Sequence, residues 1–249
     1  MASETAAARS APDAAAALSP TALAEALLVA FKTGDDPGPF LTRLAELDDS
    51  DLATVRTDRA TALAFWCNLY NAGTQHLLDT RASLYESRLR SLRFFSVPAV
   101  TVAGQPLGLD DIEHGVLRGR SKYGLGYLPR LFPNTFEMRY RLAEVDPRIH
   151  FALNCGAASC PSIRAYTPDA IDAQLDLATE TYLDATVAYD PAENTLSVPP
   201  LLRWYRGDFG GNAGMRAFLD RYGALPDGDP TIRYRSWDWT LTAGKFTDR

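Results

Sequence analysis

The sequence predicts an α+β fold: a single domain, mainly helical, with a small and mostly antiparallel sheet. Helical and extended segments are interspersed without the regular strand–helix–strand rhythm of a parallel sheet. No linker rich in proline or serine divides the chain after residue 18, and no internal repeat is visible. A chain of 249 residues with 46% hydrophobic residues is long enough to bury a sizeable core. One globular domain over residues 19–249 follows.

The first element after a low-complexity start is a helix. Residues 1–18 are rich in alanine and broken by charges and a proline, and we predict that they are disordered. Ser19 and Pro20 form an N-cap and a first helical residue, and Gly34 provides the stop. A second, short helix is expected at 40–47.

The strongest helical pattern lies at 59–78, where large apolar residues surround three amides. Asn68, Asn71 and Gln75 recur at helical spacing and therefore share a face. Because aromatic residues flank them, we expect Asn68 and Asn71 to be buried. A buried amide must be hydrogen-bonded. The two asparagines are therefore predicted to support the fold or a binding site.

In the middle of the chain, the spacing of the apolar residues changes several times between a helical and a strand pattern. A mixed helix is expected at 81–92, a hairpin at 94–109 and a helix at 110–119. Glu113 and His114 lie in that last helix, where the acidic residue could orient the imidazole. A buried strand at about 149–155 is expected to be central, because Ile149 begins a run in which apolar residues alternate.

The remaining elements are shorter. A clear amphipathic helix is expected after a capping segment, followed by a hairpin, two helices and a last extended segment. Their predicted ranges are 170–184, 188–198, 199–205, 212–222 and 232–241.

Two of the three cysteines flank the small-residue loop that follows the predicted central strand. Cys155 ends the strand and Cys160 precedes a proline. A rigid strand followed by a loop with reactive side chains is a common way to build a site. Cysteine becomes a nucleophile when an imidazole, a cation or a helix N-terminus stabilises its thiolate. Cys155 and Cys160 are therefore candidate catalytic residues. Cys67, inside the long helix, is expected to be a packed apolar residue.

Candidate partners of these thiols are polar residues nearby in sequence or in a neighbouring helix. His114 and His150 are the candidate bases, and strand alternation favours His114 as the partner of Cys155. His150 and Asn154 share a strand face and could form a supporting pair. Arg164 could hold an anionic substrate group.

Other roles for the same residues remain open. The two cysteines and two histidines could form a zinc site, although no CxxC pair is present and no cofactor is otherwise expected. Cys155 and Cys160 could instead form a reversible disulfide. The cluster could also be inert and hold loops together.

Composition narrows the class of partner. The net charge is −6 without a basic stripe, so nucleic acid is not an expected partner. No apolar run is long enough for a membrane span and no secretory signal is visible, which predicts a soluble protein in the cytoplasm. No nucleotide-binding motif is present. The oligomeric state is left open by the sequence.

Five segments, AFWCNLYNAG, LDDIEHGVLRG, IHFALNCGAASCPSIRAYTP, LLRWYRGDFGG and IRYRSWDWTLT, together resemble the signature blocks of domain of unknown function 547. They follow the same order and span about residues 60–242. The resemblance implies a domain found in bacteria, archaea and eukaryotes, without an assigned reaction. The residues themselves favour a cysteine- and histidine-dependent enzyme of the hydrolase or transferase type, acting on a small or peptide-like ligand. The alternative is a non-catalytic binding or protein-interaction module with a structural Cys/His cluster.

Overall fold

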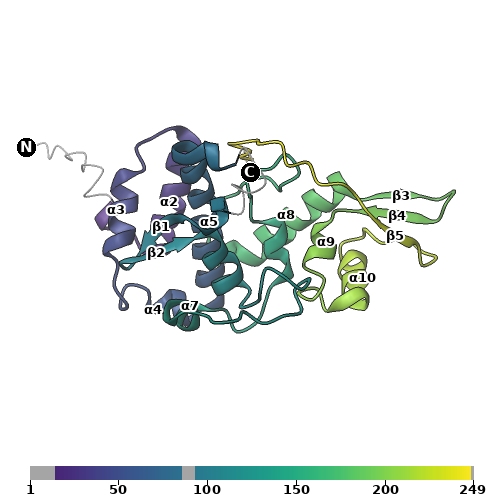
Figure 1. The fold of residues 1–249 in the computed structure, drawn as a ribbon, viewed down its shortest axis with the longest axis horizontal. Helices are drawn as coiled ribbons and strands as arrows, with labels where there is room; N and C mark the ends of the chain where they lie inside the picture. Colours follow the sequence, from purple (N-terminus) through teal and green to yellow (C-terminus); the bar gives the residue numbers. More distant parts are fainter. Residues whose placement is uncertain (1–14, 86–92, 248–249) are drawn as a thin grey trace, which may run out of the picture.

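The computed structural model describes residues 15–85 and 93–247. The molecule is elongated, with the N-terminal helices at one end and a three-stranded sheet at the other (Figure 1). The α-helices are α2 (Pro20–Thr33), α3 (Gly38–Glu46), α4 (Ala53–Thr57), α5 (Arg59–Arg81), α7 (Thr135–Tyr140), α8 (Ile171–Thr186), α9 (Leu201–Trp204) and α10 (Gly211–Arg221). Shorter helices are η1 (Ala82–Leu84), the π-helix η2 (Asp111–Leu117), η3 (Pro147–Phe151) and η4 (Pro168–Ala170).

Two small sheets complete the fold. Strands β1 (Pro98–Val102) and β2 (Gln105–Gly108) form an antiparallel hairpin. In the second sheet, β3 (Ala188–Asp190) pairs with β4 (Thr195–Val198) in antiparallel orientation, and β5 (Thr231–Tyr234) pairs with β4 in parallel. The prediction of a mainly helical α+β domain with mostly antiparallel pairing is confirmed.

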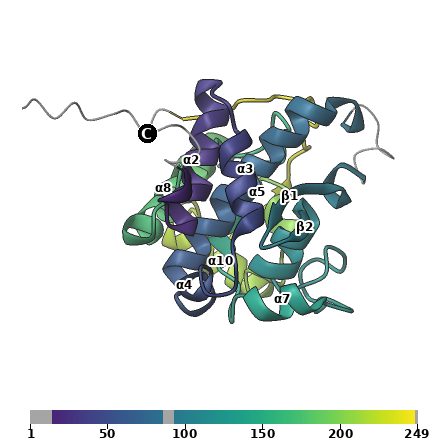
Figure 2. The ribbon, with the colours of Figure 1, turned by 90° about the vertical axis from the view of Figure 1, so that its left-hand side faces the viewer.

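Helix α5 is the central element of the larger half of the molecule, where α2, α4 and β1 pack against it and α3 packs on α2 and β1 (Figure 2). Asp58 caps its N-terminus by accepting a hydrogen bond from the backbone N–H of Thr61. Every residue from Ala62 to Gln75 is buried, so the helix has no solvent face over that stretch. The amide face predicted from the sequence is therefore an interior surface, available only to other parts of the chain.

The predicted central strand at 149–155 is wrong. Residues Pro147–Phe151 form the 3₁₀-helix η3, which Asp146 caps by accepting a hydrogen bond from the N–H of Arg148. Ile149 packs into the core around α5, whereas Phe151 packs into a second core between α8, α9 and α10. The run is apolar because it joins two cores, and a short buried run does not by itself distinguish a strand from a helix.

Three further predictions need correction or lie wholly or partly outside the described residues. The hairpin begins at Pro98, because residues 93–96 are helical. Most of the mixed helix predicted at 81–92, and residues 1–14 of the predicted disordered start, lie outside the described residues.

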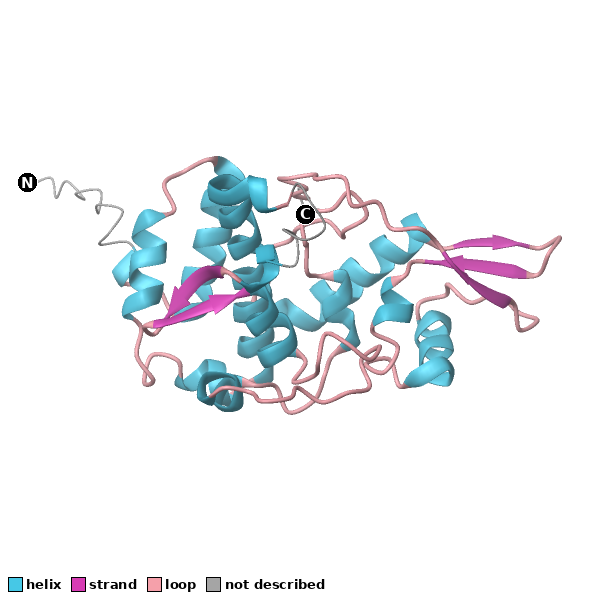
Figure 3. Ribbon diagram, in the orientation of Figure 1, coloured by secondary structure: helices cyan, strands magenta, loops and turns pink. Residues whose placement is uncertain are grey.

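Long loops gather in the middle of the molecule, between the two cores (Figure 3). Two of them matter for the site. We name residues 154–163 the cysteine loop and residues 235–247 the strap.

Candidate functional site

Asparagine side chains of α5 and of the loop itself hold the cysteine loop in place through hydrogen bonds. Asn71 donates a hydrogen bond to the carbonyl of Ala152 (3.0 Å) and accepts one from the N–H of Asn154 (2.9 Å). The side chain of Asn154 then donates to the carbonyl of Pro161 (2.6 Å) and accepts from Gly156 (2.8 Å), which closes the loop. Asn68 holds both backbone groups of Tyr166 in the same way. The amide face of α5 thus sets the course of the loop.

The strap crosses the other side of the cysteine loop and pairs with it through the backbone. Ala158 N–H donates to the carbonyl of Thr240 and Thr242 N–H donates to that of Gly156, both at 2.8 Å. At its far end, Ile163 N–H donates to the carbonyl of Lys245 (2.8 Å). The loop is therefore held between α5 and the strap.

Cys155 and Cys160 are paired as a disulfide across this loop, with their Cα atoms 6.3 Å apart. Cys155 is half-buried, whereas Cys160 is only 1% exposed. The N–H of Cys155 also points at the sulfur of Cys160, at 3.1 Å. Cys67 is fully buried in α5, and burial raises the pKa of its thiol far above the ordinary value. The packing role predicted for Cys67 agrees with this burial.

The disulfide lies in the wall of a cavity of about 290 Å³, which we name the aromatic cavity. His114, His150 and Glu113 line the same cavity, so the structure brings these candidates together with both cysteines. Its other lining residues are mainly aromatic or charged: Tyr70, Phe95, Asp110, Lys122, Tyr123, Leu153, Pro161, Leu201, Trp204, Tyr205, Trp237 and Trp239.

His150 is held by a buried carboxylate. Its Nε2 lies 2.9 Å from Oδ2 of Asp208, and both side chains are essentially unexposed. A carboxylate only accepts, so Nε2 carries the proton and Nδ1 of the neutral ring keeps its lone pair. Burial lowers the pKa of His150, although Asp208 partly opposes this, so the ring is neutral at pH 7. The ring stacks on Tyr205 with centroids 3.8 Å apart.

His114 has the opposite arrangement. Nη1 of Arg118 lies 2.7 Å from its Nδ1, and because a guanidinium only donates, that nitrogen must accept. The proton of His114 is therefore on Nε2, which lies 3.6 Å from Asp110. Burial lowers the pKa of His114 as well. Since its accepting nitrogen is occupied, His114 is a poorer base than His150, which reverses the order of preference drawn from the sequence.

Glu113 is a buried carboxylate between two phenols. Tyr70 donates to its Oε2 at 3.2 Å, and Tyr205 also donates to it. Burial alone would raise the pKa of Glu113, but His114 and Arg118 outweigh burial and hold it below the ordinary value. Both phenols have raised pKa values through burial and this carboxylate. Glu113 is therefore a fixed negative charge at the cavity wall.

Some predicted contacts are not formed. Within residues 15–85 and 93–247, no hydrogen bond joins either cysteine sulfur to His114 or His150. The predicted pair of His150 and Asn154 is wrong, because Asp208 binds the imidazole while Asn154 braces the loop. Among the same described residues, no group of three or more His, Cys, Asp or Glu is placed to hold a metal ion.

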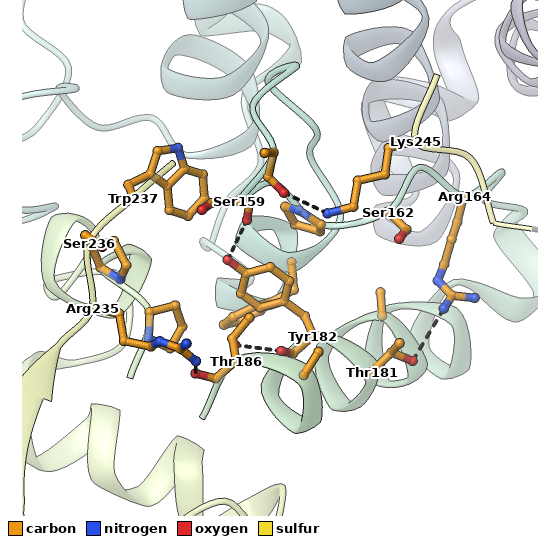
Figure 4. Close-up of a pocket in the computed structure, with 17 residues that line it drawn as sticks. Ser159, Ser162, Arg164, Thr181, Tyr182, Thr186, Arg235, Ser236, Trp237 and Lys245 are labelled. Atoms are coloured by element: carbon orange, nitrogen blue, oxygen red, sulfur yellow. Dashed lines mark hydrogen bonds between the residues drawn. The ribbon is translucent and has the colours of Figure 1, made fainter. Parts of the chain in front are cut away.

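Arg164 lines a different cavity, of about 400 Å³ (Figure 4). We name it the basic cavity, because Arg164, Arg235 and Lys245 all line it. Arg164 donates to Thr181 Oγ1 of α8 at 3.4 Å. The residue predicted to hold an anionic group thus lines a different cavity from the two histidines.

Several residues of the site were missed or undervalued from the sequence. Asp208 is not among the candidates named from the sequence, yet its side chain is fully buried against Arg118 (2.6 Å) and His150. Tyr205 and Trp237 come from segments far from the cysteines in the chain. A lone aspartate between Gly207 and Phe209 gives no periodic signal, so only three-dimensional proximity could identify it.

The part of the chain that the structure describes contains no helix that is both long and apolar enough to cross a membrane. Comparison with known proteins finds no match among curated proteins or solved structures. A family model does match, over residues 55–183, which include α5, Glu113, His114, His150 and both paired cysteines. Asp208, Tyr205 and the strap lie beyond the matched residues. Because the match spans more than half of the chain, the protein belongs to the family described as Protein of unknown function, DUF547.

Proposed function

We propose that this protein is a cysteine-dependent enzyme in which Cys155 is the nucleophile and His150, held by Asp208, is the base. The observation that carries the proposal is that Cys155 and His150 both line the aromatic cavity. Cys155 is the more accessible of the paired cysteines, and His150 is the histidine whose accepting nitrogen has no partner among the described residues. A cavity of about 290 Å³ lined with aromatic rings suits a small or peptide-like substrate.

Acyl transfer at Cys155 requires that the Cys155–Cys160 disulfide is reduced. In the cytoplasm, which the sequence predicts as the location, thiols are normally kept reduced. Nδ1 of His150 takes the thiol proton, through a water molecule since the two groups are not in contact. The thiolate attacks the acyl carbon, a carbon–sulfur bond forms, and the leaving group departs with that proton. Water or an acyl acceptor then cleaves the thioester, which makes the enzyme a hydrolase or a transferase.

The Cys155–Cys160 pairing favours a second candidate, thiol–disulfide exchange. In that reaction the Cys155 thiolate attacks a substrate disulfide and releases one thiol. Cys160 then attacks Cys155, the second thiol leaves, and the protein pair is oxidised by two electrons. The half-buried Cys155 would be the attacking sulfur and the buried Cys160 the resolving one.

Cysteine reactivity tests the proposal. The native protein is reduced with a phosphine, freed of reductant and treated with iodoacetamide at pH 7, and labelling of each cysteine is followed by peptide mass spectrometry. We expect Cys155 to be labelled first, and Cys67, the internal control, only after unfolding. If Cys155 in the reduced native protein is as inert as Cys67, the proposal fails and the non-catalytic binding module is the remaining function.

Two variants separate the candidate reactions. The reduced wild-type protein, Cys155→Ser and Cys160→Ser are assayed against acyl thioesters and against small disulfides. Cys155→Ser should lose either activity. Cys160→Ser should retain acyl transfer if that is the reaction, but should stop at a mixed disulfide with Cys155 if exchange is the reaction.

A further inference from the structure

Aromatic rings form a large part of the wall of the aromatic cavity. Among its lining residues within 15–85 and 93–247, seven are phenylalanine, tyrosine or tryptophan: Tyr70, Phe95, Tyr123, Trp204, Tyr205, Trp237 and Trp239. Trp239 is 52% exposed and Tyr123 is 66% exposed, so both rings keep a surface that a ligand can cover. Large apolar side chains that stay accessible in a concave site are typical of ligand contacts.

The three tryptophans of this wall form one cluster. The ring centroids of Trp204 and Trp237 are 5.2 Å apart, and those of Trp237 and Trp239 are 6.0 Å apart. Trp204 and Trp239 are nearly parallel, with 22° between their planes and 6.1 Å between their centroids. Aromatic rings prefer offset-stacked or edge-to-face contact with another ring, at centroid distances of about 4.5–7 Å. The cluster therefore offers a surface that suits a further planar ring.

The strap holds Trp239 beside the paired cysteines. The carbonyls of the two residues next to it, Asp238 and Thr240, accept hydrogen bonds from backbone N–H groups of the cysteine loop, at 3.2 and 2.8 Å. The indole is thus anchored to the same loop that carries Cys155 and Cys160. A ring that is fixed in advance relative to the sulfur does not have to be ordered when a ligand binds.

A cation is the other kind of ligand that aromatic rings bind. In this cavity, however, cationic side chains of the protein already lie over two of the rings. Cζ of Arg118 is 4.6 Å from the ring centroid of Tyr205, and Nζ of Lys122 is 5.7 Å from that of Tyr123. The two carboxylates of the wall accept hydrogen bonds from other side chains of the protein. A cationic ligand would meet charges of its own sign at these rings. An uncharged ring is therefore the better fit.

We propose that the three tryptophans are a subsite for an uncharged aromatic ring of the substrate, and that Trp237 and Trp239 determine specificity. The substrate class is then an acyl compound whose aromatic side chain lies close to the carbon that Cys155 attacks. This inference rests on the proposed function for the reaction at sulfur, whereas the binding of a ring does not depend on it.

Binding without reaction tests the ring subsite. N-acetylphenylalaninamide, N-acetylcyclohexylalaninamide and tetramethylammonium are titrated separately into the reduced Cys155→Ser variant, and the indole N–H signals are followed by NMR. We expect the phenyl compound to shift the signals of Trp237 and Trp239. It should bind about threefold to tenfold more tightly than the cyclohexyl compound, as one additional aromatic contact predicts. Trp66 is fully buried in α5, so its signal should not move and serves as the internal control.

Two variants test whether the indole itself is responsible. Trp239→Leu keeps an apolar side chain but removes the ring, so it should abolish the preference for the phenyl compound. Tyr127→Leu is the matched control, because Tyr127 is also an aromatic residue with 52% exposure but does not line the aromatic cavity. It should keep the preference. An unchanged Trp66 signal shows that each variant is folded.

A pair of alkylating agents tests the connection with Cys155. N-benzylbromoacetamide and N-(cyclohexylmethyl)bromoacetamide are compared in their reaction with the reduced wild-type protein. The sulfur–carbon bond forms, bromide leaves and the thiol proton passes to the solvent. Relative to their rates with free cysteine, the benzyl compound should react about threefold to tenfold faster. Trp239→Leu should remove this difference, and Tyr127→Leu should leave it unchanged.

The outcomes for this subsite and for the proposed enzyme can be told apart. If the phenyl compound shifts neither indole signal, or binds no more tightly than the cyclohexyl compound, the ring subsite is overturned whatever Cys155 does. If tetramethylammonium alone shifts the signals, the site binds cations and the inference is wrong. Ring binding without a faster reaction of the benzyl compound overturns the role of the tryptophans in substrate selection. Ring binding beside a Cys155 that reacts with neither agent refutes the proposed enzyme and leaves a non-catalytic site for aromatic ligands.

Discussion

Replacing Asp208 by asparagine should be the most informative single change at the site. Asp208 pairs with Arg118 at 2.6 Å and with His150 at 2.9 Å, and the side chains of Asp208 and Arg118 are 0% exposed. The variant keeps the size of the side chain but leaves the guanidinium buried beside a neutral amide. Removing one partner of a buried ion pair costs about 3–5 kcal/mol. We expect Asp208→Asn to lower the free energy of unfolding by that amount.

Urea unfolding followed by tryptophan fluorescence measures this loss, and the slope m should stay unchanged. Asp229→Asn is the matched control, since Asp229 pairs with Arg216 at 2.8 Å but its side chain is 88% exposed. An exposed pair contributes at most about 1 kcal/mol. If the two variants lose the same small amount, the buried network does not stabilise the fold and the reasoning is refuted.

The same variant should change the dependence of stability on pH. Burial would raise the pKa of Asp208, but His150 and Arg118 outweigh it and hold the pKa below 3.8. A carboxyl whose pKa is lower in the folded state adds stability above its unfolded pKa, and that stability is lost as the pH falls through the folded value. The wild-type protein should therefore lose this contribution below about pH 4, and Asp208→Asn should not. If the free energy of unfolding falls equally in the two proteins as the pH drops below about 4, Asp208 is not the group responsible.

Three further predictions concern other parts of the site. Asn71→Ala removes two buried hydrogen bonds to the backbone and should cost about 2–5 kcal/mol in urea unfolding, whereas the exposed Asn212→Ala should cost less than about 0.5 kcal/mol. Ellman titration of the oxidised protein should find no thiol in the native state and one, Cys67, in denaturant; a second thiol there would disprove the pairing of the other two. His114 and His150 should titrate below 6.5 in proton–carbon NMR spectra, because burial lowers the pKa of both imidazoles. Both residues should then reduce stability as the pH falls below 6.5, since the unfolded chain binds those protons first. Midpoints above 6.5 would show instead that the neighbouring carboxylates outweigh burial.

The sequence predicted the elements with strong local signals and missed the ones defined by distant contacts. The N-cap at Ser19, the stop at Gly34 and the amide face of α5 are local patterns, and the structure has all three. The alternation of apolar residues at 149–155 predicts a strand, but Pro147–Phe151 form a 3₁₀-helix in which the polar residues are buried as well. A short run that is buried on every side does not distinguish a strand from a helix. Residue types placed both histidines beside the cysteines, but the sequence favoured His114 over His150. Asp208 fixes His150 from 58 residues away, a contact that no local pattern encodes.

In the strap, the backbone and the side chains have different roles. Its backbone holds the cysteine loop, through the carbonyls of Asp238, Thr240 and Lys245. Its side chains, among them Arg235, Trp237 and Trp239, face the two cavities. Since main-chain pairing tolerates most side-chain replacements, ligand preference can diverge along this segment while the sulfur pair keeps its geometry. If the proposed function holds, relatives that share the cysteines yet differ in the strap would act on different molecules through the same pair of sulfurs.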